Sequence, residues 1–217
     1  MSVEMTILSS RDEWLKNRMN GVGGSEISAV LGLNPYLDNV TLWEYKTGKR
    51  TPEDISDKPY VKYGTEAEYH LRELFKLDFP DFDVKYIENN SFKNDRFPWA
   101  RASLDGWIID KDGRKGILEI KTTEVLSSMS KEKWNEQIPQ NYYCQVLFYM
   151  AVFEAEFAVL KAQLKTVFND IPYLQTRHYF IEASDVRDDM AYLMQKGSEF
   201  WEFVKNGKKP PLVLPEI

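Results

Sequence analysis

The amino-acid sequence predicts a mixed α/β or α+β fold, in which helices precede, divide and follow a compact sheet. Apolar residues recur at helical spacing before position 78, and from Asp83 the pattern changes to the alternation of strands. A very apolar helix over 138–154 interrupts the strands, and an amphipathic helix over 185–205 follows them. Because the chain shows no repeat or linker, we expect residues 1–217 to form one domain.

Four helices are expected before the strands begin. The first covers 11–19, and the second follows the glycine-rich stretch 21–26 with Ser25 as its N-cap. The third opens at Thr41, in a Thr-x-x-Glu capping box, and the fourth covers 60–77.

The strands are expected in the middle and last thirds of the chain. They cover 84–87, 100–103, 106–109, 116–120, 157–164 and 177–182. The turn sequence Asp-Lys-Asp-Gly-Arg at 110–114 joins two of them in a hairpin. The hairpin therefore brings the start of one strand beside the end of the other.

Composition excludes several classes of protein. The chain is 43% hydrophobic and 29% charged, which is typical of a globular protein. It has no apolar run long enough to span a bilayer and no secretory signal at its N-terminus, so we expect a soluble, cytoplasmic protein. One cysteine, Cys144, excludes an internal disulfide and a four-cysteine metal site, and two histidines argue against a histidine-rich catalytic centre. The net charge of −6 argues mildly against nonspecific nucleic-acid coating but does not exclude a nuclease.

The most informative motifs lie on the predicted hairpin. Asp105 precedes one strand, and Glu119 and Lys121 lie on the other. Because side chains alternate along a strand, Glu119 and Lys121 share a face, and we expect Ile117 and Ile120 to point inward. Two carboxylates and an ammonium at one point would suit a metal-dependent phosphodiesterase, since Mg²⁺ binds carboxylate oxygens and activates water. The alternative is an ordinary Asp-Gly turn beside a solvated Glu–Lys pair.

Two further side chains could serve the same site. Glu68, with Glu66 as a competitor, could hold a metal-bound water or a second ion, or it could simply stabilise a helix dipole. Gln145 lies in the apolar helix, where an unpaired buried amide costs about 1–3 kcal/mol. It either bonds to the backbone or donates to the attacking water or the phosphate.

A possible anion site lies near the N-terminus. Arg18, the amides of the glycine-rich stretch and the helix start at Ser25 all favour a phosphate group. The alternative is an arginine that lies beside an ordinary loop without a ligand.

Taken in order, these motifs resemble those of the lambda-type phage exonucleases, also called YqaJ-like viral recombinases, within the PD-(D/E)xK nucleases. The resemblance runs from Trp14 to about Tyr149. Its elements are Trp-x-x-x-Arg ending at Arg18, Gly-x-x-x-Ser-Glu at 21–26, Gly-x-x-x-Glu ending at Glu68, Ser-Leu-Asp-Gly around Asp105, Leu-Glu-Ile-Lys ending at Lys121, and Gln-Val at 145–146. Leu104 replaces the family's proline, and Leu147 stands where a second glutamine often lies.

The resemblance implies a restriction-endonuclease-like core, with a central mixed sheet flanked by helices and with extra N-terminal helices. It implies a 5′-to-3′ exonuclease that digests double-stranded DNA ends to 3′ single-stranded overhangs for recombination. The expected cofactor is Mg²⁺, with Mn²⁺ as a possible substitute. The expected partners are DNA ends, a phage single-strand annealing protein and further copies of the chain in a trimeric ring. The expected setting is a bacterial host cell, with a phage or prophage as the source.

The resemblance also assigns roles to residues. It implies that Asp105, Glu119 and the main-chain carbonyl of Ile120 bind the metal, with Glu68 assisting directly or through water. Lys121 and Gln145 would act on the water or the phosphate. Arg18 and Ser25 would bind the terminal 5′-phosphate. The alternatives are an endonuclease on the same fold and a DNA-binding recombination module that has lost turnover.

Overall fold

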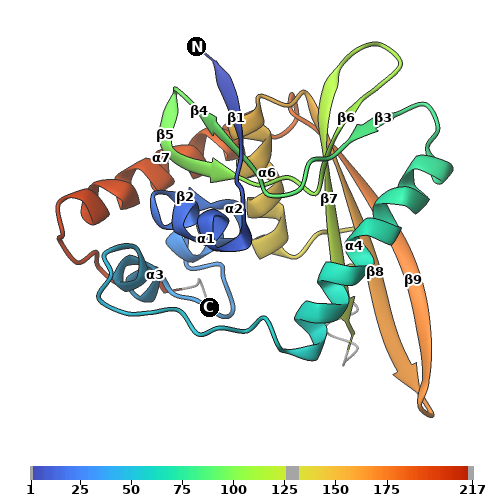
Figure 1. The fold of residues 1–217 in the computed structure, drawn as a ribbon, viewed down its shortest axis with the longest axis horizontal. Coiled ribbons are helices and arrows are strands. Elements are labelled where there is room, and N and C mark those ends of the chain that lie inside the picture. Colours follow the sequence, from blue (N-terminus) through green and yellow to red (C-terminus); the bar gives the residue numbers. More distant parts are fainter. Residues whose placement is uncertain (1, 126–131, 215–217) are drawn as a thin grey trace.

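The strands form two sheets rather than the one central sheet that we expected (Figure 1). The computed structural model describes residues 2–125 and 132–214. The smaller sheet contains, in spatial order, β1 (Val3–Ile7), β4 (Asn90–Asn94), β5 (Phe97–Ala102) and β2 (Val22–Gly23). The larger contains β3 (Asp83–Lys85), β6 (Gly106–Ile109), β7 (Lys115–Glu124), β8 (Phe157–Phe168) and β9 (Ile171–Glu182).

Both sheets are mixed, as the fold class requires. In the larger sheet, β7 and β8 are parallel, while the pairs β6–β7 and β8–β9 are antiparallel. A parallel pair needs a crossover connection, and α6 (Gln140–Phe153) supplies it. In the smaller sheet, the short strand β2 runs parallel to β5.

Helices cover both faces of the larger sheet (Figure 1). The remaining helices are α1 (Arg11–Met19), α2 (Gly24–Val30), α3 (Asn39–Lys46), α4 (Pro59–Asp78) and α7 (Arg187–Lys205). α4 packs on one face, where Phe75 joins a buried cluster with Ile120 of β7. α6 packs on the other face, where Leu147 joins a larger cluster with Ile117 of β7. Ile117 and Ile120 therefore both point inward, as expected, but on opposite faces of one strand, because helices cover both faces of the sheet.

Two predicted helix caps are also wrong. Gly23, not Ser25, is the N-cap of α2, and Ser25 is the second residue of that helix. Asp38 caps α3, because its carboxylate accepts hydrogen bonds from the backbone N–H groups of Val40 and Thr41 at 2.9 and 2.8 Å. The helix therefore begins before Thr41, and the predicted capping box does not form.

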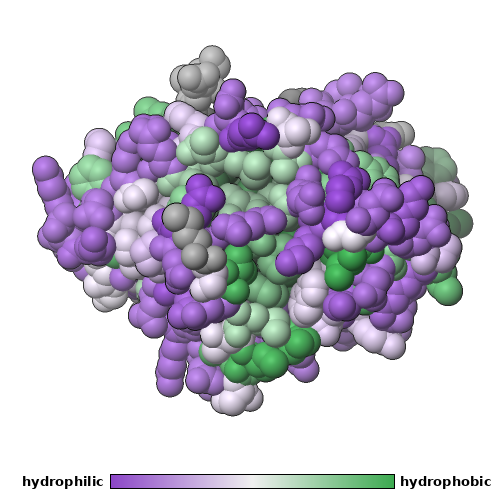
Figure 2. Space-filling model, turned by 90° about the horizontal axis from the view of Figure 1, so that it is seen from above, coloured by the Kyte–Doolittle hydropathy of each residue, from purple (hydrophilic) through white to green (hydrophobic). Residues whose placement is uncertain are grey.

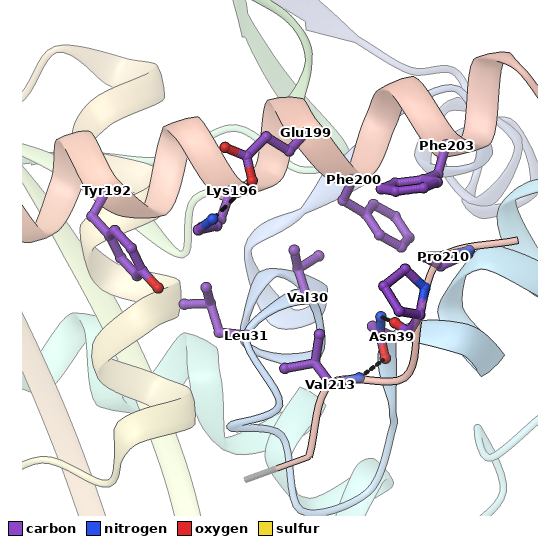
Figure 3. A pocket seen from close by; sticks show the side chains of 11 residues that line it. Val30, Leu31, Asn39, Tyr192, Lys196, Glu199, Phe200, Phe203, Pro210 and Val213 are labelled. Atoms are coloured by element: carbon purple, nitrogen blue, oxygen red, sulfur yellow. Dashed lines mark hydrogen bonds and ion pairs between the residues drawn. The ribbon is translucent and has the colours of Figure 1, made fainter. Parts of the chain in front are cut away.

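The C-terminal segment is fastened to α3 by one buried side chain. The amide of Asn39 donates to the carbonyl of Pro211 at 2.8 Å, and its oxygen accepts the N–H of Val213 at 3.0 Å. Figure 3 shows this segment opposite Phe200 and Phe203 of α7. The Asn39 side chain thus satisfies one carbonyl and one N–H group of the tail, as the backbone of a neighbouring strand would, and it fixes the tail beside α7.

The outer surface is mostly hydrophilic. In Figure 2, hydrophilic residues cover much of the face shown, and hydrophobic residues gather in a band through its middle. Within residues 2–125 and 132–214, no helix has the length and apolar character needed to cross a membrane.

Candidate active site

The hairpin β6–β7 brings Asp105 beside Glu119, as its turn sequence predicts. Gly106 pairs with Leu118 in the antiparallel register, so Asp105 lies at the level of the next residues of β7. Its Oδ2 accepts a hydrogen bond from the backbone N–H of Ile120 at 2.8 Å. The carboxylate of Asp105 is therefore held against the strand that carries Glu119 and Lys121.

Glu119 is buried, and only one of its two carboxylate oxygens accepts hydrogen bonds. Its side chain is 1% exposed, and Oε1 accepts hydrogen bonds from Lys121 Nζ at 2.5 Å and from Gln145 Nε2 at 2.7 Å. No described residue donates to Oε2, although this oxygen is buried. A buried carboxylate oxygen without a partner is costly, so this position favours a further positive group.

Glu68 joins the site from α4. It lies near the middle of that helix rather than at its N-terminus, so the dipole explanation does not apply. Its Oε1 accepts from Arg72 Nη1 at 2.9 Å, and the same nitrogen donates to the main-chain carbonyl of Asp105 at 2.6 Å. Glu66, the competitor, is exposed on the helix surface.

A glycine lets α4 come close enough for this contact. A Cβ added at Gly64 would lie 3.2 Å from Thr122 Oγ1 on β7. That distance is tighter than ordinary van der Waals contact, so a larger residue would push the helix outward. The glycine four positions before Glu68 therefore has a packing role in the Gly-x-x-x-Glu motif.

Negative charge dominates the site. Burial, followed by the nearby Asp105, raises the pKa of Glu119 to about 8 and that of Glu68 to about 7. Burial likewise raises the pKa of Asp105. Although burial alone favours a neutral amine, the two carboxylates Glu119 and Asp105 raise the pKa of Lys121. Three carboxylates thus face two cations, Lys121 and Arg72.

The donor set fits a hard divalent cation. Asp105, Glu119 and a main-chain carbonyl offer oxygen ligands only, and the unpaired Oε2 adds a free acceptor. In the described part of the chain, no three His, Cys, Asp or Glu side chains lie close enough to hold an ion by themselves. Since Arg72 already binds the carboxylate of Glu68, Glu68 is better suited to an indirect role through water than to direct coordination of the ion.

Gln145 bonds to side chains rather than to the backbone. Besides Glu119, its Nε2 lies 3.3 Å from the hydroxyl of Tyr149 one helical turn later. A Cβ added at Gly24 would lie 2.3 Å from Tyr149 Cε1, so the start of α2 is packed directly on this ring. Burial raises the pKa of Tyr149 and keeps its hydroxyl neutral. Tyr149, which the sequence analysis did not single out, connects the acidic site to α2.

Arg18 and Ser25 belong to a separate cluster of charged side chains. Arg18 Nη2 donates to Ser25 Oγ at 2.9 Å and lies 3.4 Å from Glu26 Oε1. The buried Lys46 also pairs with Glu26, at 2.8 Å, and donates to the main-chain carbonyl of Arg18 at 2.8 Å. Burial opposes ionisation of Glu26, but Lys46 and Arg18 lower its pKa below the usual value. Two cations and one anion leave this cluster with net positive charge.

Trp14 connects the two parts of the site. The guanidinium groups of Arg11 and Arg18 both lie over its indole, with their Cζ atoms 4.2 and 4.8 Å from the ring centroid. Its Nε1 donates to Ser103 Oγ at 2.8 Å, two residues before Asp105. The helix that carries Arg18 is thereby fixed to the loop that carries Asp105.

Asn90 holds this loop from β4. Its amide donates to the carbonyls of Ile87 and Leu104 at 2.8 and 2.9 Å, and its oxygen accepts the N–H of Leu104 at 2.8 Å. Leu104, which stands in place of the family's proline, is buried. These bonds fix the backbone on the N-terminal side of Asp105 without the stiffness of a proline.

A cavity elsewhere in the molecule lacks such chemistry. It has a volume of about 380 Å³ and lies between α7, α2 and the C-terminal segment (Figure 3). The charged residues that line it, Lys196 and Glu199, pair with each other at 2.8 Å. The acids around Glu119, not this cavity, are the candidate active site.

Comparison with known proteins places the chain among recombination proteins. Residues 13–156 match the model of the family described as the YqaJ-like viral recombinase domain. Over 212 residues, the chain is 32% identical to the uncharacterized protein YqaJ of Bacillus subtilis strain 168. This match covers 94% of the chain but only 59% of that relative, so the chain spans less than two thirds of its length.

Solved structures show the same fold. The alkaline exonuclease LHK-Exo from Laribacter hongkongensis superimposes with a TM-score of 0.66 at 16% identity, over 90% of this chain and 93% of that one. Its complex with dAMP gives a TM-score of 0.65 over the same shares at the same identity. A phage-related exonuclease from Haemophilus somnus 129PT gives 0.58 at 12% identity, over 86% of this chain and 96% of that one.

Proposed function

The chain belongs to the YqaJ-like viral recombinase domain family, and we propose from this premise that it is a metal-dependent deoxyribonuclease acting on the ends of duplex DNA. It digests one strand in the 5′-to-3′ direction and leaves 3′ single-stranded overhangs. The observation that carries the proposal is the buried Oε2 of Glu119, which has no hydrogen-bond donor in the described part of the chain and lies in a site with excess negative charge. Such an oxygen is suited to bind a cation.

The proposed cofactor is Mg²⁺, with Mn²⁺ able to replace it. Asp105, Glu119 and the Ile120 carbonyl would hold the ion, and Glu68 would assist through water. A divalent cation in such a site lowers the pKa of a bound water and neutralises charge on the attacked phosphate. The excess of one carboxylate over the two cations of the site means that a dication makes it positive, which favours a phosphodiester.

Lys121 and Gln145 act on the reacting groups. Because the surrounding carboxylates keep Lys121 protonated, its ammonium can orient the attacking water and stabilise charge on the phosphate oxygens. Gln145 donates to Glu119, and its amide would hold the water or a phosphate oxygen. The water oxygen forms a new bond to phosphorus while the bond to the 3′ oxygen breaks, and that oxygen takes up a proton.

Arg18 and Ser25 bind the 5′-phosphate at the end of the strand. Cleavage of the bond to the 3′ oxygen releases a 5′-mononucleotide and leaves a new 5′-phosphate on the shortened strand. Each cut thus regenerates the group that Arg18 binds, which supports stepwise digestion. The structural relative that binds dAMP, a deoxynucleoside monophosphate, supports this product.

The wider assignments rest on the family resemblance. Residues 1–217 form one nuclease domain of the PD-(D/E)xK type, and α6 packs against both of its sheets. The protein works as a ring of three copies with a phage single-strand annealing protein as its partner.

Linear and circular duplexes test the proposal. Purified protein with Mg²⁺ should digest end-labelled linear duplex, leave covalently closed circles intact and lose activity when a chelator is added. Lys121→Ala should abolish digestion, and a variant that digests at the parent rate would refute the role of that residue. Cleavage of circles would identify an endonuclease instead, and binding of DNA without cleavage would identify an inactive recombination module.

A further inference from the structure

We propose that Arg72 is a positioning residue that fixes Glu68 and the Asp105 loop to each other and thereby sets the affinity of the site for its divalent cation. This inference rests on the proposed function and goes beyond it, because Arg72 is none of the groups that are proposed to hold the ion or the DNA. In the sequence, Arg72 lies one helical turn after Glu68.

One nitrogen of Arg72 makes both connections. Nη1 donates to Glu68 Oε1 at 2.9 Å and to the main-chain carbonyl of Asp105 at 2.6 Å. The nitrogen carries two hydrogens, so it can make both bonds at once. Since the Arg72 side chain is only 5% exposed, water competes little for these bonds. A helix and a loop that are distant in the sequence are thus held by the same atom.

Tyr86 fixes the orientation of this guanidinium. The Cζ atom of Arg72 lies 3.5 Å from the centroid of the Tyr86 ring, which is close stacking. Tyr86 follows β3, so the stacking connects a third segment of the chain to α4 and the Asp105 loop. A lysine could supply the charge of Arg72, but it has neither the planar group that stacks nor the fixed directions of its N–H donors.

Charge and position predict opposite effects when Arg72 is removed. When all three are ionised, the carboxylates of Glu68, Asp105 and Glu119 exceed the cations Arg72 and Lys121 by one negative charge. Loss of Arg72 doubles that excess, so charge balance alone predicts tighter binding of a cation. Loss of position predicts weaker binding, because the acids no longer hold the geometry of the bound state. The sign of the change therefore decides between the two roles.

Mn²⁺ titration of the full chain, followed by electron paramagnetic resonance, measures this sign. Arg72→Lys keeps the charge and loses the planar donor group, and Arg72→Met loses both. We expect both variants to bind Mn²⁺ roughly tenfold or more weakly, the size of effect seen when groups that orient metal ligands are removed. Thermal unfolding in chelator, recorded in parallel, shows whether each variant is folded.

Arg114→Lys is a matched control. Arg114 bonds to two carboxylates, Asp110 and Glu182, at 2.8 Å each, and its Cζ lies 5.0 Å from the ring centroid of Phe157. It lies just before β7, five residues before Glu119, and contacts none of the proposed metal ligands, so its replacement should leave Mn²⁺ affinity unchanged.

Tyr86→Leu and Tyr86→Phe provide a second pair that leaves Arg72 in place. Removal of the ring should weaken Mn²⁺ binding severalfold, and removal of the hydroxyl alone should not. If Arg72→Met does not fold, these variants still show whether the orientation of Arg72 controls Mn²⁺ affinity.

Several results would overturn the inference. Tighter binding by Arg72→Met with unchanged binding by Arg72→Lys would show that Arg72 only balances charge. Lower thermal stability with unchanged affinity would show a role in folding alone. If the parent protein itself binds no Mn²⁺, the proposed function fails. If the parent and all the variants bind Mn²⁺ equally well, only the role of Arg72 is refuted.

Discussion

Replacement of Asn90 by alanine should damage both stability and activity, because this side chain holds the loop that presents Asp105. The change removes three hydrogen bonds, to the Ile87 carbonyl and to the carbonyl and N–H of Leu104, with lengths of 2.8, 2.9 and 2.8 Å. The side chain is 3% exposed, so water does not readily replace them.

The expected loss of stability is about 3 kcal/mol, from about 1 kcal/mol for each lost bond. That loss is a large share of the roughly 5–15 kcal/mol by which a folded domain is stable. It corresponds to a fall in melting temperature of about 6–12 °C for a chain of this size. Displacement of the Asp105 loop should also reduce the nuclease rate per folded molecule by about tenfold to a hundredfold.

Urea unfolding and end-labelled duplex digestion at 25 °C measure the two effects. Asn94→Ala is the matched control, since Asn94 lies on the same strand and also makes three hydrogen bonds, to Val152, Glu154 and Arg96. It should lose similar stability but keep its rate per folded molecule. Equal rates for Asn90→Ala and the parent would refute the positioning argument, and a stability loss well under 1 kcal/mol would refute the energetic one.

Three further predictions follow from the pKa shifts, the proposed phosphate site and the packing of α2. In chelator, thermal stability should fall as the pH rises from about 6 to about 9, because the pKa values of Glu68 and Glu119 in the folded state, about 7 and about 8, lie above their usual value. The folded state then loses protons that stabilise it, and Mg²⁺ should reduce this loss of stability. A stability in chelator that rises over this pH range would contradict the pKa shifts. Arg18→Ala should reduce the preference for 5′-phosphorylated over 5′-hydroxyl ends by at least about tenfold in a digestion assay, since a charge-assisted bond contributes about 1.5–3 kcal/mol. An unchanged ratio would show that Arg18 does not bind the 5′-phosphate. Gly24→Ala should cost about 1–3 kcal/mol in urea unfolding, because its Cβ would lie 2.3 Å from the ring of Tyr149, and a neutral result would show that α2 can move freely.

The sequence predicted the elements whose signals are local. The turn at 110–114 and the alternation on either side fixed the hairpin, and with it the approach of Asp105 to Glu119. The apolar pattern over 138–154 predicted the helix α6, which carries Gln145. Both predictions depend on neighbours a few residues apart, where periodicity is a reliable guide.

The missed elements depend on contacts between distant residues. β4 reads as polar, yet Asn90, Ser91 and Asn94 are buried because partners from other segments satisfy them. β1 was missed as well, and its pairing with β4 forms the second sheet. No local pattern distinguishes an asparagine that is buried and hydrogen-bonded to distant backbone groups from one that lies in a loop.

The same limit explains the site residues that were missed. Lys46 lies twenty residues after Glu26 in another helix, and only the fold shows that the two form an ion pair. Arg72 was visible as a neighbour of Glu68, but its second bond, to the Asp105 carbonyl, is tertiary. The carboxylates were identifiable from motifs, whereas the groups that orient them were not.

A crystal soaked in Mn²⁺ shows where the ion binds, because its anomalous scattering locates it. We expect one strong peak within coordinating distance of Asp105, the free oxygen of Glu119 and the carbonyl of Ile120, and we expect that peak to disappear in Glu119→Gln. A peak bound elsewhere, or one that persists in that variant, would contradict the proposed metal site.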